Sequence, residues 1–83
     1  MDILYFAWVR EQIGVDREQL DPPADITDMQ GLIGWLAGRS AGHASALGDT
    51  ARLRAAIDQK YVAFDAPIAG AREIAIFPPV TGG

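Results

Sequence analysis

The hydrophobic pattern divides the chain into strand-like runs separated by turn residues. Apolar, aromatic and β-branched residues fill residues 3–9, and shorter runs cover 53–57, 60–64 and 73–77. Such runs are typical of β-strands. The first run has no polar position until Arg10, so we predict a central strand that is buried on both faces. The last run alternates, with Ile74 and Ile76 on its expected inner face.

Turn and breaker residues mark the ends of these runs. Residues 10–14 predict a short helical turn that is closed by Gly14. A weakly polar strand follows at 16–20 and is expected at a sheet edge, where a Pro-Pro pair ends it. The pair Asp58-Gln59 predicts a two-residue hairpin turn between the runs at 53–57 and 60–64.

One segment has helical periodicity. Thr27 followed by Gln30 matches a capping box, which predicts a helix that begins with Thr27 as its N-cap. The helix is expected to end between Gly38 and Gly42. The apolar residues at spacings of three and four are Met29, Leu32, Ile33 and Leu36, and they should face the sheet.

Residues 40–50 are small and polar and predict a crossing loop with one short helical turn at 44–47. The single histidine, His43, lies in this segment without another residue at metal-ligand spacing. We therefore interpret His43 as a solvated loop residue and give it no role.

The order of elements predicts the fold. A central first strand, an edge strand, one main helix, a crossing loop and three further strands predict a mixed five-stranded sheet over the helix. The long crossover allows the first and last strands to pair in parallel. The expected architecture is an α+β roll of the β-grasp, ubiquitin-like type over residues 1–77, with residues 78–83 as an extended tail.

The face opposite the helix is expected to be apolar. Alternation in the first and last strands and in the hairpin directs bulky side chains outward, and uncovered apolar patches often mark partner interfaces. We name Phe6, Tyr61 and Phe77 as candidate partner contacts. The predicted patch consists of Leu4, Phe6, Trp8, Tyr61, Ala75 and Phe77.

Composition excludes several classes of function. The 83 residues contain no cysteine, so the chain supplies no thiolate, disulfide or cysteine nucleophile. A net charge of −4 disfavours nucleic-acid and membrane-surface binding. Lys60 is the only lysine, which fits poorly with a modifier that forms chains on itself. Without an apolar run of about 18 residues or a signal-like N-terminus, we expect a soluble cytoplasmic protein. The lack of cysteine and the single histidine predict no bound metal.

The last six residues carry the candidate chemistry. Pro78 and Pro79 cannot continue a hydrogen-bonded ladder, so the chain should leave the sheet there. Six residues in a polyproline-like conformation would span roughly 19 Å. The end of this tail, Gly82-Gly83, has no side chains and could enter a narrow active site. The tail predicted to insert into a partner is therefore Pro78, Pro79, Val80, Thr81, Gly82 and Gly83.

The carboxylate of Gly83 is the expected reactive group. Its reference pKa is about 3.5, so it is ionised at neutral pH and is a poor electrophile. An acyl adenylate formed from ATP would activate it, and a persulfide sulfur from another protein could then convert it to a thiocarboxylate. The absence of cysteine agrees with an imported sulfur atom.

Three sequence segments resemble a known family. They are Phe6-Ala7 with Val9-Arg10-Glu11 and Gly14, then Ala56-Ile57-Asp58-Gln59, and finally the seven residues from Phe77 to Gly83. Together they resemble the small subunits of molybdopterin synthase, which are ubiquitin-like sulfur carriers. The chain departs from the family at the hairpin asparagine, here Asp58, and at the turn before the last strand.

This resemblance implies a function and a set of partners. It implies that the tail enters the large, catalytic synthase subunit and gives its sulfur to a cyclic pyranopterin phosphate, on the way to the molybdenum cofactor. It also implies a heterotetramer of two small and two large subunits. A ubiquitin-activating-type adenylating enzyme would use ATP, a sulfur donor would act through a partner, and this chain would bind no cofactor.

Alternative functions stay open at this point. A diglycine tail would also suit a carrier for thiamine synthesis or for tRNA thiolation. The chain could instead be a ubiquitin-like protein modifier joined to lysines, or a binding module that ends in glycine. Arg10 is expected to tether a loop or the tail rather than to react.

Overall fold

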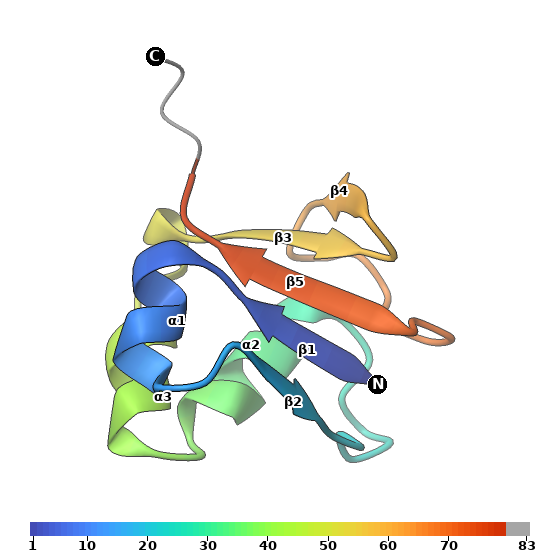
Figure 1. Cartoon of the computed structure of the whole chain (residues 1–83). Coiled ribbons are helices and arrows are strands. Elements are labelled where there is room, and N and C mark those ends of the chain that lie inside the picture. The colour runs from blue at the N-terminus through green and yellow to red at the C-terminus, as the bar shows by residue number, and fades with distance from the viewer. Residues whose placement is uncertain (80–83) are drawn as a thin grey trace.

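The computed structural model describes residues 1–79 and contains one mixed sheet with three flanking α-helices (Figure 1). Five strands lie in the order β2-β1-β5-β3-β4. In chain order the elements are β1 (Asp2–Tyr5), α1 (Ala7–Ile13), β2 (Arg17–Gln19), α2 (Met29–Ala37), α3 (Ala41–Leu47), a 3-10 turn η1 (Thr50–Arg52), β3 (Arg54–Ile57), β4 (Lys60–Val62) and β5 (Glu73–Phe77).

The sheet topology confirms the predicted β-grasp roll. Strands β1 and β5 pair in parallel at the centre, with Ile3 beside Ile74. The other pairs are antiparallel, and the weak strand β2 lies at an edge as expected. Strand β5 covers the predicted residues, and its Ile74 and Ile76 are fully buried.

The β3–β4 hairpin turns at the predicted pair. Asp58 and Gln59 have positive φ angles of 49° and 71°, which a two-residue type I′ turn requires. Aspartate is one of the few residue types besides glycine that tolerate a positive φ angle. The Oδ1 atom of Asp58 also accepts hydrogen bonds from the backbone N–H groups of Arg72 and Glu73, at 3.0 and 2.9 Å. The aspartate therefore fastens the hairpin to the start of β5.

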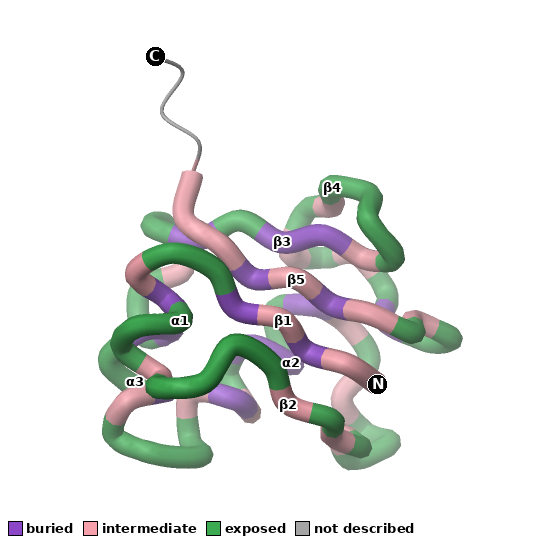
Figure 2. The backbone as a smooth tube through the Cα atoms, in the orientation of Figure 1, coloured by how far each residue is buried: buried purple, intermediate pink, exposed green. Residues whose placement is uncertain are grey.

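Helix α2 lies behind the sheet in Figure 1 and supplies much of the core. Its four predicted apolar residues are all buried and pack with the inner residues of β1, β3 and β5. Figure 2 shows buried stretches on α2 and on these strands. The predicted N-cap was wrong by one position. Asp28, not Thr27, accepts the capping bond, from Gly31 N–H at 2.8 Å. Thr27 instead uses its backbone carbonyl to bind Ile68, which joins two loops.

The predicted strand at 3–9 was too long. Strand β1 ends at Tyr5, and Ala7 has a φ of 54°, which turns the chain out of the sheet into helix α1. Both elements bury apolar side chains, such as Tyr5 and Val9 in the same core. A continuous apolar run therefore fits a strand followed by a helix as well as one long strand. The predicted end at Gly14 is confirmed, since it adopts the left-handed conformation with a φ of 97°.

The predicted crossing loop contains helix α3, which is longer than the single turn expected at 44–47. Its N-cap is Ser40, whose hydroxyl accepts the His43 N–H at 3.1 Å. Helix α3 packs closely on α1 because Gly42 has no side chain. A Cβ atom at Gly42 would lie 2.5 Å from the backbone oxygen of Gln12.

We expect Gly42→Ala to lower the free energy of unfolding by about 1–3 kcal/mol, because the methyl group must push α1 and α3 apart. Gly34→Ala is the matched control in α2, where nothing lies within 4 Å of the added Cβ. That control should gain up to about 1 kcal/mol from helix propensity. Urea denaturation measures both, and equal stability of the two variants would contradict the close packing at Gly42.

Candidate docking surface and tail base

The outer face of the sheet carries an aromatic patch close to the end of the described chain. The rings of Tyr61 and Phe77 pack at 5.4 Å between centroids with a tilt of 41°. Pairing in the sheet explains this contact, since β3 lies between β4 and β5 and its Ala56 is opposite both Tyr61 and Ala75. Ala56 is small, so the larger side chains can meet over it. We define the aromatic patch as Phe6, Ala56, Tyr61, Ala75 and Phe77.

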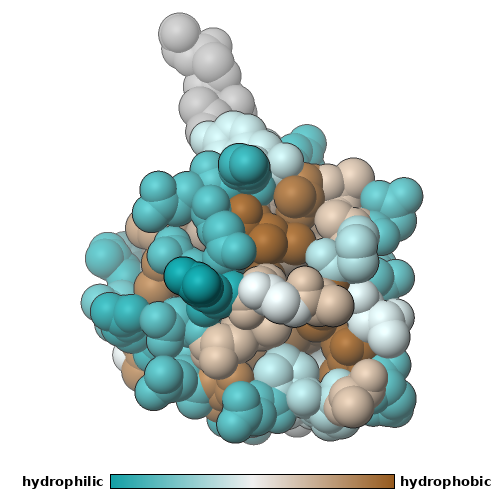
Figure 3. Space-filling view, turned by 90° about the vertical axis from the view of Figure 1, so that its right-hand side faces the viewer, coloured by the Kyte–Doolittle hydropathy of each residue, from teal (hydrophilic) through white to brown (hydrophobic). Residues whose placement is uncertain are grey.

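The three predicted contact residues are thus brought together. They line one shallow hollow of about 360 Å³, whose polar margin is formed by Gln59 and Glu73. Tyr61 is 79% exposed and Phe6 is 47% exposed, which are high values for large apolar side chains. Figure 3, which views the molecule from the right-hand side of Figure 1 rather than onto the outer face of the sheet, also shows apolar surface below the end of the described chain. A small domain gains nothing in its own stability from such exposure, so the patch is suited to a partner.

Trp8 does not line this hollow, although we predicted it in the patch. It lies in α1, and its ring is 4.7 Å from the guanidinium carbon of Arg52. Both residues line a separate hollow together with Pro78 and Pro79. The side chains at positions 6 and 8 would share a face in a strand, but the turn at Ala7 sends them to different surfaces. Leu4 is half-buried beside Ala75 on the outer face.

The base of the tail is where the sheet ends. Phe77 is the last residue of β5, and Pro78 and Pro79 follow it outside any strand, as their missing N–H groups require. Both prolines are half-buried. The predicted inserting residues Val80, Thr81 and Gly82 and the predicted reactive Gly83 lie outside the described residues. Arg10 is exposed on α1, and its side chain makes no ion pair or hydrogen bond within residues 1–79.

Away from the tail, Glu18 is the centre of a partly buried polar cluster that the sequence did not reveal. One carboxylate oxygen of Glu18 accepts from the Tyr5 hydroxyl at 2.7 Å and from His43 Nε2 at 2.8 Å. His43 Nδ1 lies 2.7 Å from the Ser40 hydroxyl, and Arg39 approaches the other Glu18 oxygen at 3.9 Å. The cluster joins β1, β2 and α3.

Our interpretation of His43 as a solvated loop residue was wrong, because its side chain is 8% exposed and every ring nitrogen has a partner. The reason is the unpredicted helix α3, which points His43 inward beside Ala46 and Leu47. Their spacing of three and four residues was the available signal. We assign the cluster a structural role.

Charges and hydrogen bonds shift two pKa values in this cluster. Partial burial by itself raises the pKa of Glu18, but the hydrogen bonds from His43 and Tyr5 and the charges of His43 and Arg39 outweigh it, so the pKa lies below its ordinary value. Burial first, and then the bond to Glu18, raises the pKa of the Tyr5 hydroxyl above its ordinary value. Glu18 is therefore an anion that accepts from a neutral tyrosine.

We expect Glu18→Ala to cost about 1–3 kcal/mol of unfolding free energy at neutral pH, because the Tyr5 hydroxyl and His43 lose a buried acceptor. The cost should shrink as pH falls below the ordinary value of 4.5. There the unfolded chain takes up a proton that folded Glu18 still resists, so the stabilisation is lost as pH falls through the folded pKa. Denaturation across pH measures this, and exposed Glu11→Ala is the control. If the stability difference between Glu18→Ala and the original chain did not change with pH, the lowered pKa of Glu18 would be contradicted.

Residues 1–79 contain no group of three potential metal ligands and no helix long and apolar enough to cross a membrane. The features that remain for function are the aromatic patch, the hollow beside Trp8 and the base of the tail.

Comparison with known proteins identifies the family of this chain. A model described as the ThiS family matches residues 3–83. The molybdopterin synthase sulfur carrier subunit of Escherichia coli is 42% identical over 98% of this chain and 96% of its own length. Its counterpart from Haemophilus influenzae is 37% identical over 100% and 99%. Among solved structures, SAMP1 from Haloferax volcanii superposes with a TM-score of 0.76 at 26% identity, covering 100% of this chain and 98% of that one.

Proposed function

Because this chain belongs to the ThiS family, we propose that it is the sulfur carrier subunit of a molybdopterin synthase, acting in molybdenum cofactor biosynthesis. The observation that carries the proposal is the extent of the likeness. Two relatives named for this function match almost from end to end, and the family match runs through Gly83. The described domain adds an exposed aromatic patch at the end from which the tail departs.

The proposed chemistry takes place at the carboxylate of Gly83. A partner of the ubiquitin-activating type adenylates it, as a carboxylate oxygen attacks the α-phosphate of ATP and pyrophosphate leaves. A persulfide sulfur from a donor protein then attacks the acyl carbon and displaces AMP. A second thiol cleaves the resulting S–S bond, which leaves a thiocarboxylate on Gly83 and a disulfide on the donor. The chain itself contributes no cysteine to these steps.

The sulfur is then delivered inside a complex. We propose that the aromatic patch docks on the large, catalytic subunit while the tail carries the thiocarboxylate to a cyclic pyranopterin phosphate. Docking makes the transfer effectively intramolecular, which lowers the entropic part of the barrier. The catalytic acids and bases belong to the large subunit, and the complex is a heterotetramer of two small and two large subunits.

Two further features belong to the proposal. The same patch is expected to serve the adenylating enzyme, so docking must be reversible. We place the carrier in the cytoplasm, where ATP is available for this activation. Candidate contacts are the predicted residues Phe6, Tyr61 and Phe77, whose exposure and mutual packing support the assignment.

Intact-mass spectrometry tests this function. After incubation with the adenylating enzyme, ATP and a sulfur donor, the carrier should gain the mass difference between one sulfur and one oxygen atom, and fragmentation should place it on Gly83. Incubation without ATP is the control. The proposal fails if no such species forms, or if the chain is instead found joined to lysines of other proteins.

A further inference from the structure

The surface beside the tail base has features that the aromatic patch does not explain. A hollow of about 490 Å³ is lined by Trp8, Ala51, Arg52, Pro78 and Pro79, which we call the Trp8–Arg52 platform. The guanidinium of Arg52 lies over the Trp8 ring at 4.7 Å, a distance at which the cation and the ring attract each other. Arg52 itself is exposed, so this contact fixes a charge at the surface.

Resting on the function proposed above, we propose that this platform binds a carboxylate on the large synthase subunit, at the entrance of the pocket that receives the tail. The first argument is position. Gly83 is the fourth residue after Pro79, and a fully extended chain of four residues spans at most about 14 Å. A pocket that encloses Gly83 must therefore have its entrance near Pro79, where the platform lies.

The second argument is the state of Arg52. None of the salt bridges within residues 1–79 includes it. The acidic residue nearest to Arg52 in the sequence is Asp49. Its carboxylate caps η1 by accepting from Ala51 N–H at 3.2 Å. A guanidinium covered by a partner without a carboxylate would be left with unpaired donors, which is costly. The planar guanidinium of Arg52, held beside the Trp8 ring, has its donors in the fork geometry that a carboxylate matches.

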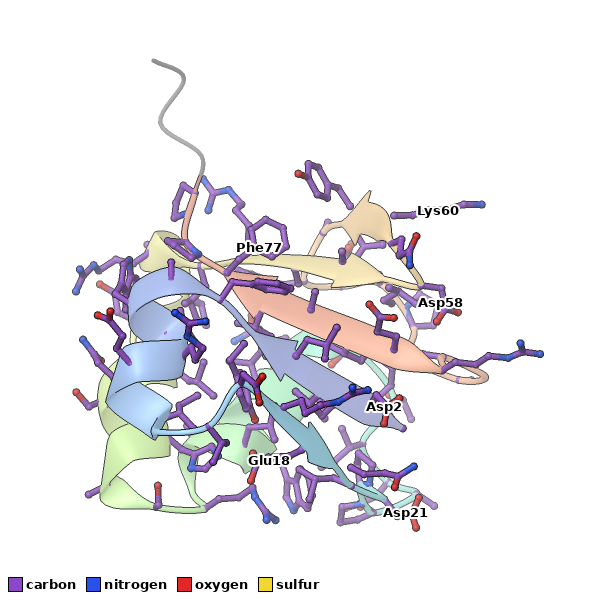
Figure 4. All side chains as sticks on the ribbon, viewed as in Figure 1. Asp2, Glu18, Asp21, Asp58, Lys60 and Phe77 are labelled. Carbon is purple, nitrogen blue, oxygen red and sulfur yellow. The ribbon has the colours of Figure 1, made fainter. Side chains whose placement is uncertain are left out.

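The third argument is the distribution of charge. The chain is acidic overall, with a net charge of −4, and an acidic surface would repel it as a whole. The labelled acids Asp2, Asp21 and Asp58 lie away from Phe77 and the end of the described chain (Figure 4). Arg54 is a second exposed cation near the tail base, because it lies opposite Phe77 in the register of β3 and β5. Arg52 and Arg54 thus place two exposed cations beside the tail base, where Asp49 is the adjacent acid.

Binding of the carrier to the large subunit from the same genome tests the platform. At low salt we expect Arg52→Glu to raise the Kd about 10- to 100-fold, through slower association and faster dissociation. The difference should shrink at high salt, because ions screen the interaction. Arg52→Lys keeps the charge but loses the planar fork, so about a threefold loss is expected.

Arg72→Glu is the matched control. It makes the same charge change at an exposed site before the start of β5, about 17 Å along the strand from Phe77, and should bind like the original chain. All variants should melt at similar temperatures, since both arginines are exposed.

The outcomes separate this inference from the proposed function. If the original chain binds and forms the thiocarboxylate while Arg52→Glu matches Arg72→Glu, only the platform role is overturned. The same holds if Arg52→Glu weakens binding to the adenylating enzyme alone. If the original chain neither binds the large subunit nor forms a thiocarboxylate, both proposals fall together.

Discussion

Deletion of Gly83 is expected to abolish sulfur transfer while leaving the fold intact. The shortened chain still ends in glycine with a free carboxylate, but that group stops one residue earlier, about 3.3 Å short in an extended chain. A displacement of about 1 Å can cost on the order of 10²-fold in rate, so we expect at least that loss in both adenylation and sulfur delivery. Thiocarboxylate formation and product formation by the assembled synthase measure it.

Two comparisons interpret the deletion. Gly83→Ala keeps the length and the carboxylate but adds one methyl group, so it tests whether the receiving site is too narrow for a side chain. Thermal unfolding of the deleted chain should match that of the original, because the last core residue within residues 1–79 is Ile76. If the deleted chain still carried sulfur at the original rate, Gly83 would not be the reactive residue.

Tyr61→Asp is expected to be the most damaging single change on the domain surface. Tyr61 is 79% exposed and stacks on Phe77, so the change hardly disturbs the fold, but it places a charge at the centre of the aromatic patch. Buried aromatic anchors at interfaces commonly contribute 2 kcal/mol or more, which is about a 30-fold increase in Kd. Titration calorimetry with the large subunit measures the effect.

Val15→Asp is the matched control for this variant. Val15 is also an exposed apolar residue, at 44%, but it lies between α1 and β2, away from the aromatic patch. It should bind the large subunit normally. Equal losses in Tyr61→Asp and Val15→Asp would show that added charge matters rather than position, and the aromatic patch would lose its assigned role.

The spacing of apolar residues predicted correctly those elements whose pattern fits only a strand or only a helix. In β5 the alternation around Ile74 and Ile76, and in α2 the spacing from Met29 to Leu36, follow directly from burying one face. The hairpin turn at Asp58 was also predicted from the sequence. The long crossover between the first and last strands then left parallel pairing as the consistent topology.

The errors have a common physical origin. Strand β1 and helix α1 share one apolar run, and only the backbone turn at Ala7 separates them. Helix α3 is rich in small residues with a weak apolar signal, and it forms because it packs on α1 and α2. The Glu18–His43 bond joins residues 25 positions apart, and nothing local to either indicates the other.

By itself, the sequence determined the sheet with its main helix and showed that the chain has no cysteine, while the reactive tail stays a prediction. These follow from local properties, since periodicity, proline and residue type act within a few positions. Only the tertiary structure decided which aromatics meet, because the turn at Ala7 separates Phe6 from Trp8 and strand pairing places Tyr61 on Phe77. It likewise placed Arg52 over Trp8 beside the tail base, a contact between residues that are distant in sequence.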